Sequence, residues 1–353
     1  MSTTIAKTET TEFVNEIEAI YEQPVTYKLR ASSTWVTKPN KERTIFESLA
    51  TIDLADKKNY TVQPKNPNPP PIHSIWLERF WFFYTVSPPL IIHALWYYIV
   101  PENNYFHTWH PLFAFLFYSV AFFLIITRIA DHCHYYMKYY GTFDEHNRPR
   151  DYVPDKLVTR LVMSVLIYIL ARTGGGLLLG GYDRNSPPSL GHTISWFFPI
   201  KIGVWLIVLD FFFYSYHRMT HTIPFLWKIH SLHHCTKHPT VLQSILAGDI
   251  QELIEIFLIP LATSFVLPLT VHEFWIAQCV LIYMEAGGHS GIRAYWPHII
   301  LYEVLQPFGM EICIEDHDLH HRYGKSGMNY GKQTRVFDRI FGTISERIEC
   351  LQK

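Results

Sequence analysis

The chain has 353 residues, a length that fits either one large domain or two small ones. Hydrophobic residues make up 48% of it and charged residues 17%, which is below the roughly 25% charge of an average soluble domain and favours contact with lipid. The net charge of −1 excludes a general basic surface for nucleic acid, and five scattered cysteines without a CxxC pair exclude a disulfide framework.

Residues 1–72 form a predicted polar N-terminal arm. This stretch has no signal-peptide pattern, and it ends in a segment rich in Pro and Asn, residues 63–73. Residues 11–23 are compatible with a short amphipathic helix or with a solvated segment, and both interpretations stay open. The chain therefore divides into this arm and a membrane-embedded domain, residues 73–353.

Four apolar segments are predicted to cross the membrane as helices. The first covers about residues 80–100, carries no charge, and is long enough for a hydrocarbon core of about 30 Å. The pair Pro88-Pro89 should kink it. The other three cover about residues 111–127, 157–181 and 193–214.

The loops and a second apolar region set the expected topology. Residues 101–110 contain no Lys or Arg, whereas residues 131–156 contain several, so the positive-inside rule places the second loop in the cytosol. Apolar stretches between Leu253 and Met284 predict a re-entrant hairpin that returns the chain to the same side. The predicted fold class is an all-α integral membrane protein with about four transmembrane helices, this hairpin and a cytosolic helical cap.

Three histidine clusters in region 215–343 are the most informative feature. HRMTH, HSLHH and HDLHH supply the candidate ligands His217, His221, His230, His233, His234, His317, His320 and His321. Residues three or four apart share one helix face, so each cluster could aim its imidazoles at one point. Eight neutral imidazoles exceed the needs of one tetrahedral ion and suit two metal ions. Without metal, each buried unpaired nitrogen would cost roughly 1–3 kcal/mol.

Neighbouring residues are further candidates. In YMEAGGHSG, His289 lies four residues after Glu285, and we expect it to be a ninth imidazole ligand. Glu285 stays open between a ligand, a hydrogen-bond acceptor for a ligating imidazole and an ordinary charge, and so do Asp316 and Asp318. Structural roles are expected for the histidines with other spacing, which include His132, His134 and His238.

The order HRMTH, HSLHH, GGHSG and HDLHH, followed by NYG and FDRIFGT, resembles the fatty acid hydroxylase and sterol desaturase superfamily. The resemblance covers about residues 131–343 and includes C4-methylsterol oxidases, C5-sterol desaturases and sphingoid-base hydroxylases. It implies that the nine histidines named above hold two iron ions at the cytosolic face of the endoplasmic reticulum membrane, in a multi-pass protein. The chain has no HPGG haem motif, so the NAD(P)H electrons must arrive through a separate donor, for which cytochrome b5 and its reductase are expected.

The expected reaction is O₂-dependent hydroxylation of an apolar lipid, a sterol or related terpenoid. Imidazole serves several metals, but lipid C–H bonds are not acidic and Zn²⁺ has no redox state, so the chemistry favours iron. A C5-sterol-type desaturase and a sphingoid-base or fatty acid hydroxylase stay open. A membrane zinc hydrolase and a metal carrier are disfavoured, because the chain has no HExxH or GxSxG motif and its clusters lie outside the spans.

Two surfaces have alternative interpretations. The glycine-rich residues 171–181 could line a substrate tunnel, but close helix packing explains them better. Basic residues near the clusters could receive an acidic electron carrier, although the positive-inside rule also predicts them: Lys228, Lys237, Arg322, Lys325, Lys332, Arg335 and Arg339.

Overall fold

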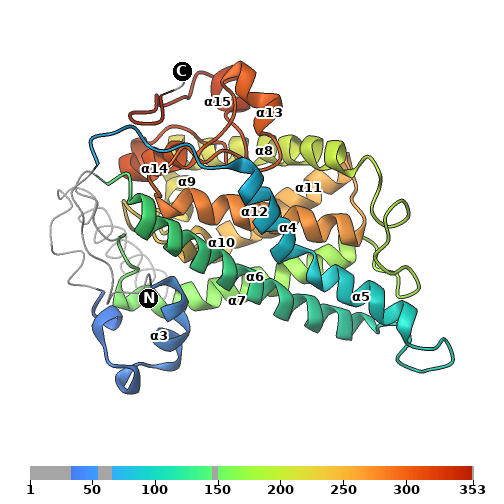
Figure 1. Ribbon diagram of the computed structural model, residues 1–353. Coiled ribbons are helices and arrows are strands. Elements are labelled where there is room, and N and C mark those ends of the chain that lie inside the picture. The colour runs from blue at the N-terminus through green and yellow to red at the C-terminus, as the bar shows by residue number, and fades with distance from the viewer. Residues whose placement is uncertain (1–32, 55–65, 145–149, 352–353) are drawn as a thin grey trace, which may run out of the picture.

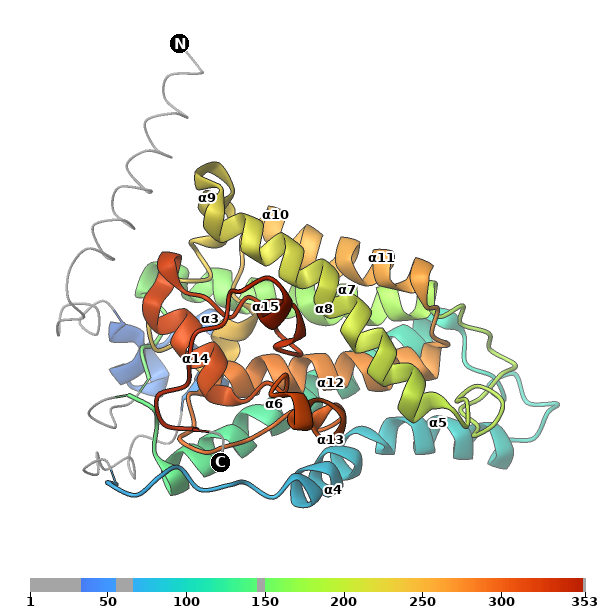
Figure 2. The same cartoon turned by 90° about the horizontal axis from the view of Figure 1, so that it is seen from above.

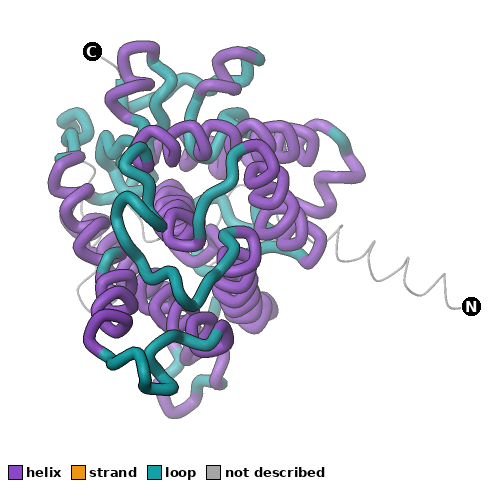
Figure 3. The backbone as a smooth tube through the Cα atoms, turned by 90° about the vertical axis from the view of Figure 1, so that its right-hand side faces the viewer, coloured by secondary structure: helices purple, strands orange, loops and turns teal. Residues whose placement is uncertain are grey.

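The computed structural model describes residues 33–54, 66–144 and 150–351 (Figure 1). Every regular element in these ranges is a helix. Figure 3, which views the molecule from the right-hand side of Figure 1, shows only helices and loops among these residues. The all-α prediction is confirmed.

The helices vary widely in length. The longer ones are α4 (Ile75–Val86), α5 (Pro88–Ile99), α6 (Pro111–Tyr140), α7 (Val158–Leu179), α8 (Phe198–Thr222) and α12 (Val271–Ser290). The shorter ones are α3 (Ile45–Leu49), α9 (Pro224–His230), α10 (Asp249–Glu252), α11 (Ile259–Val266), α13 (Tyr302–Leu305), α14 (Ile314–Tyr323) and α15 (Val336–Ile340). A π-helical turn joins α10 to α11 at Leu253–Leu258. Short 3-10 turns occupy Thr34–Thr37, Asn40–Glu42, Ala50–Asp53, Asp155–Leu157, Val241–Ile245, Gln306–Phe308 and Gly324–Ser326.

Three helices in the described residues are long and apolar enough to cross a membrane. They are α6, the continuous segment Asp155–Leu179 that contains α7, and α8. The outer face of α6 exposes Leu116, Val120 and Leu124, which recur at helical spacing and suit contact with lipid. The chain therefore has the architecture of an all-α membrane protein.

The predicted first span is interrupted. It forms α4 and α5, which have 12 residues each and meet at Ser87. A single helix needs about 20 residues to span the membrane, so neither piece is long enough alone. Pro88 occupies the first turn of α5, where its missing N–H is tolerated, and the Trp275 indole donates to the Val86 carbonyl beside the break (3.2 Å). That α4 and α5 cross together as a kinked pair remains a prediction.

The two apolar stretches predicted as a re-entrant hairpin form α11, which packs on α8, and α12; that they re-enter the membrane remains a prediction. A capping box between Thr270 and Glu273 starts α12 after the turn that follows α11. α12 lies among α6, α7, α8 and α14 (Figures 1 and 2) and buries 14 of its 20 residues. A helix that is apolar on all sides is expected to be buried, which explains why this segment resembles a membrane span.

Glycines on α7 allow α12 to approach closely. A Cβ atom at Gly176 would lie 3.1 Å from the Phe274 ring, and one at Gly180 would lie 2.4 Å from the Val271 backbone. The packing interpretation of residues 171–181 is therefore confirmed.

The described part of the N-terminal arm packs against the helical domain. Trp35 is completely buried, and its indole donates to the Val153 carbonyl (2.9 Å). Asp53 accepts a hydrogen bond from the Leu242 amide (2.8 Å), which ties the arm to the loop before α10. Residues 11–23 lie outside the described residues, and the division at residue 72 remains a prediction.

Candidate metal centre

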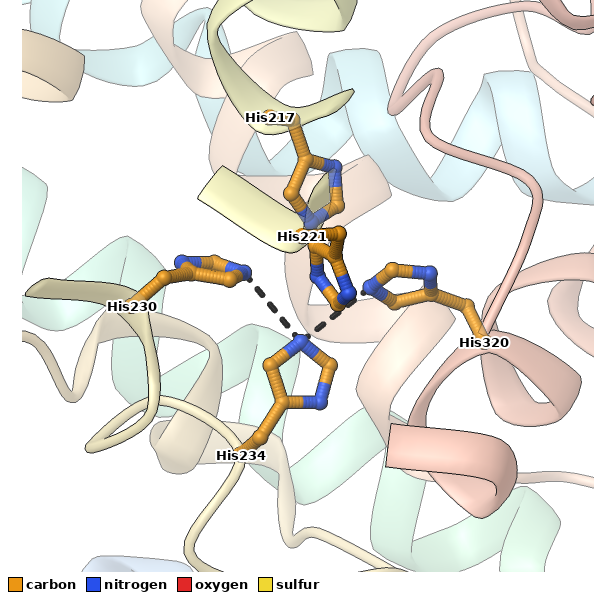
Figure 4. Close-up of side chains that lie close together, drawn as sticks. All are labelled: His217, His221, His230, His234 and His320. Carbon is orange, nitrogen blue, oxygen red and sulfur yellow. Dashed lines mark hydrogen bonds between the residues drawn. The ribbon is translucent and has the colours of Figure 1, made fainter. Parts of the chain in front are cut away.

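The nine predicted imidazole ligands gather at one end of the helix bundle. They form two groups, and within each group the potential ligand atoms lie within 4.8 Å of one another. The first contains His217, His221, His230, His234 and His320, whose rings are turned toward one another in Figure 4. The second contains His233, His289, His317 and His321. All nine residues are at most 5% exposed.

The two HxxHH clusters are divided between the groups. His320 joins the first group, whereas His317 and His321 join the second. On α14, residues four apart share a face, but adjacent residues are rotated by about 100°. The HSLHH cluster is divided for a different reason, because α9 ends at His230 and a turn carries His233 and His234. The prediction that each HxxHH cluster aims its three imidazoles at one point was therefore wrong, whereas His217 and His221 of HRMTH lie in one group as predicted.

Two imidazoles in the second group face each other in a way that a hydrogen bond cannot explain. His233 Nδ1 lies 3.1 Å from the Leu246 carbonyl, and His289 Nδ1 lies 2.7 Å from the Glu285 carbonyl. A carbonyl only accepts, so both Nδ1 atoms carry the hydrogen. The two Nε2 atoms, 3.1 Å apart, then present lone pairs to each other.

A metal ion would resolve this repulsion. Burial lowers the pKa of His233 to about 3, so a proton cannot occupy the space between the lone pairs near neutral pH. Neutral imidazole nitrogens that converge in a buried site are suitable metal ligands. The residues present therefore fit a metal at this position.

Backbone carbonyls orient the first group in the same way. The Nδ1 atoms of His217, His221 and His320 donate to the carbonyls of Tyr330 (2.7 Å), Lys325 (3.1 Å) and Met328 (2.8 Å). Among the described residues, the Nε2 atoms of His217 and His221 have no hydrogen-bond partner. Fixing Nδ1 as the donor leaves Nε2 free to bind a metal.

One segment, residues 325–330, supplies these three carbonyls, a role that its sequence pattern does not indicate. Asp210 on α8 holds this segment by accepting the Lys332 and Gln333 amides (2.9 Å each). Asp338 accepts the Gly331 amide (2.8 Å), and Asn329 has a left-handed φ of 62°. The NYG and FDR motifs after the last cluster therefore build the support for the imidazoles.

The open carboxylate candidates lie outside both groups. Asp316 accepts two hydrogen bonds from Arg347 (2.9 and 2.7 Å), and Asp318 pairs with Arg150 (2.9 Å). These contacts anchor α14, the helix of the third cluster. The Glu285 side chain is in neither group and instead lines a cavity beside His317.

Sequence comparison identifies the relatives of this chain. It is 34% identical over 299 residues to the fatty acid hydroxylase vlmA of Lecanicillium sp, and the alignment covers 81% of each protein. The chain belongs to the fatty acid hydroxylase family. The model of that family matches residues 202–343, the region that contains all nine imidazoles. The family resemblance inferred from the motifs is confirmed.

A more distant relative matches a part of this chain. The cholesterol 25-hydroxylase-like protein of Danio rerio is 26% identical over 142 residues, which cover 39% of this chain and 53% of that protein. No solved structure matches the chain.

A largely apolar cavity lies beside the second histidine group. Its walls are Cys133, Tyr283, Met284, Glu285, Gly287, Gly288, Ile292, Trp296, Ile312, Cys313, Ile314, His317 and Lys332. Residues 171–181 do not line it. A Cβ atom at Gly287 would meet no atom within 4 Å, so this glycine faces open space, whereas one at Gly288 would lie 3.2 Å from the His317 ring.

The predicted basic surface of this family member is smaller than expected. Lys332 and Arg335 are only 6% and 5% exposed, so neither is available to a docking protein. Lys332 pairs with Glu255 (3.4 Å), and the hydrogen bonds to Asp210 draw its backbone inward. Lys228, Lys325 and Arg339 are exposed as predicted.

Proposed function

We propose that this family member is a membrane-bound, non-haem di-iron oxidoreductase that uses O₂ to hydroxylate an apolar lipid, a sterol or related terpenoid. The observation that supports it most is that the Nε2 atoms of His233 and His289 lie 3.1 Å apart with no hydrogen between them, so that their lone pairs face each other. Two groups of neutral imidazoles suit two ions. Bound iron would supply the redox chemistry with O₂ that no protein side chain offers.

The protein contributes position and exclusion of water. Carbonyl groups hold His217, His233 and His320 by their Nδ1 atoms, so the imidazole rings cannot turn away from the centre. Burial of all nine rings keeps bulk water from the site. The cavity beside His317 would hold the lipid next to the second histidine group.

The chemistry of the cavity supports a lipid substrate. Apart from Glu285, Lys332 and His317, its walls are hydrophobic side chains, glycines, cysteines and a tyrosine. The Lecanicillium relative is named a fatty acid hydroxylase and the Danio relative a cholesterol 25-hydroxylase-like protein. Both names favour hydroxylation over desaturation for this chain.

Electrons for the proposed reaction would come from NAD(P)H through cytochrome b5 and its reductase. Lys228 on α9 and Lys325 after α14 are exposed, and both follow histidine-bearing segments. Cationic side chains there would attract an acidic carrier and would suit the cytosolic face of the endoplasmic reticulum membrane.

The test is product formation by membranes that contain the protein, supplied with iron, a b5-type donor and NADH. We expect O₂ consumption coupled to an oxidised lipid, found by comparing lipid extracts with and without the protein. His320→Ala should abolish both signals, while His93→Ala, which removes a buried histidine outside the two groups, should keep them. Full activity in His320→Ala, or bound zinc without O₂ consumption, would contradict the proposal.

A further inference from the structure

Two charged side chains face an otherwise apolar cavity beside the histidine groups. Lys332 comes from the segment after α14, and Glu285 comes from α12. Both are described by the structure, yet no ion pair joins them, because Lys332 pairs with Glu255 instead. Burying a charge at the wall of an apolar cavity costs free energy unless a partner compensates it, so these two side chains are expected to have one.

The Lys332 ammonium has unused hydrogen-bonding capacity. Its side chain is 4% exposed, and its one ion-pair partner in the described part of the chain, Glu255 Oε2, lies 3.4 Å away. Charge-assisted hydrogen bonds are typically about 2.7–2.9 Å long, so this contact is weak. The ammonium also lies 4.3 Å from the centre of the Phe213 ring. Of the three N–H donors of an ammonium, at least one remains for a group in the cavity.

The Glu285 carboxylate is the complementary acceptor. Among the described residues, the one hydrogen bond to its side chain comes from the Tyr168 hydroxyl at 3.4 Å, near the upper limit for such a bond. A carboxylate offers about four acceptor positions, so most of its capacity is also unused. The cavity wall therefore presents one donor and one acceptor that do not satisfy each other.

We propose that Lys332 and Glu285 bind a hydroxyl group of the lipid, so that the substrate is an uncharged lipid alcohol. A single hydroxyl oxygen can accept from Lys332 and donate to Glu285. A lipid with a carboxylate group would fit less well, because a carboxylate only accepts hydrogen bonds and would be repelled by the like charge of Glu285. Glu255 already pairs with Lys332, so Lys332 would not offset that repulsion in full. A hydrocarbon would leave both side chains unsatisfied. This inference rests on the proposed function, because it names the polar group of the lipid in the same cavity.

The test compares binding of three probes of equal chain length, octadecanol, octadecanoate and octadecane, to the purified, metal-loaded full chain in detergent. We expect octadecanol to bind about tenfold more tightly than the other two, the gain typical of hydrogen bonds to charged groups. Lys332→Met and Glu285→Gln should each weaken octadecanol binding about tenfold and leave octadecane binding unchanged. Lys41→Met, which removes an exposed lysine far from the histidine groups in sequence and without an assigned role, is the matched control.

Tighter binding of octadecanoate than octadecanol, or unchanged octadecanol binding in both variants, would overturn the inference. Lys332→Met leaves Glu255 unpaired and can impair folding, but Glu285→Gln keeps the side-chain shape and provides the test alone. Iron content is measured in parallel. If the protein binds iron and oxidises lipid but shows no preference for octadecanol, only this inference is rejected. If the protein binds no iron, the proposed function is rejected, and the comparison of the three probes still tests the hydroxyl site.

Discussion

At the scale of single residues, hydrogen bonds to the backbone prepare the imidazoles for metal. The Nδ1 atom of His217 donates to the Tyr330 carbonyl and that of His320 to the Met328 carbonyl. Both carbonyls belong to the segment that Asp210 holds through its neighbouring amides. The geometry of the first histidine group therefore depends on a carboxylate that contacts none of its rings.

Asp210→Ala should weaken both the fold and the metal site. The substitution leaves the amides of Lys332, Gln333 and Thr334 without their acceptor, and one buried unsatisfied group costs about 1–3 kcal/mol. Loss of the support for ligands typically lowers metal affinity about 10–100-fold. Thermal unfolding and iron titration measure the two effects. Asp183→Ala, in an exposed loop, is the control, and equal behaviour of the two variants would contradict the assigned role.

At the scale of helices, α12 brings together the second histidine group and the cavity. His289 lies near its end, and Gly287 and Gly288 open its surface. Because a Cβ atom at Gly287 meets nothing within 4 Å, a large side chain there would fill the cavity without moving a ligand. The cavity can therefore be closed while the histidines stay in place.

Gly287→Phe should lower lipid oxidation at least about tenfold and leave iron content unchanged, since the ring would occupy space needed by substrate. Product yield and metal analysis measure these outcomes. Gly175→Phe on α7 is the matched control, because that glycine also faces open space but lies outside the cavity. Normal turnover in Gly287→Phe would show that the substrate binds elsewhere.

Attachment of the N-terminal segment should depend on pH through Asp53. Burial raises the pKa of Asp53 to about 7, above its ordinary value near 3.9 in an unfolded chain. The folded state therefore binds the extra proton between about pH 4 and pH 7, and the stability it contributes is lost as the pH rises through that window. Protection of the amides of residues 34–53 from hydrogen exchange, relative to the intrinsic exchange rate at each pH, should be lower at pH 8 than at pH 5. Asp53→Asn should reduce the difference, and an equal difference in that variant would exclude Asp53 as its source.

At the scale of the whole molecule, three apolar helices indicate membrane association, and the nine imidazoles meet at one end of the bundle. The loop of residues 101–110 joins α5 to α6 at the opposite end (Figure 1). The positive-inside rule predicts that the histidine end faces the cytosol.

Glycosylation mapping tests this orientation in intact cells. An acceptor site introduced within residues 101–110 should be glycosylated, because that loop is predicted to lie on the lumenal side. A site introduced at residues 325–327, at the histidine end, should remain unmodified. The reverse pattern would overturn the predicted orientation without affecting the metal ligands.

The sequence predicts this site as far as local geometry determines it. His217 and His221 share a helix face, as their spacing indicates, because α8 continues through both. His233 and His234 separate because α9 ends before them, which spacing alone does not reveal. The burial of Lys332 results from hydrogen bonds to Asp210, 122 residues away, and such long-range contacts leave no local pattern. Pro88 marks the break in the first predicted span, but the absence of charge across that span favoured one continuous helix.

Iron content per chain tests the central claim most directly. We expect two iron ions per wild-type chain, one for each histidine group. His217→Ala, in the first group, and His317→Ala, in the second, should each reduce this toward one, while His93→Ala keeps both. An iron-free wild-type protein, or unchanged iron in both group variants, would contradict the account.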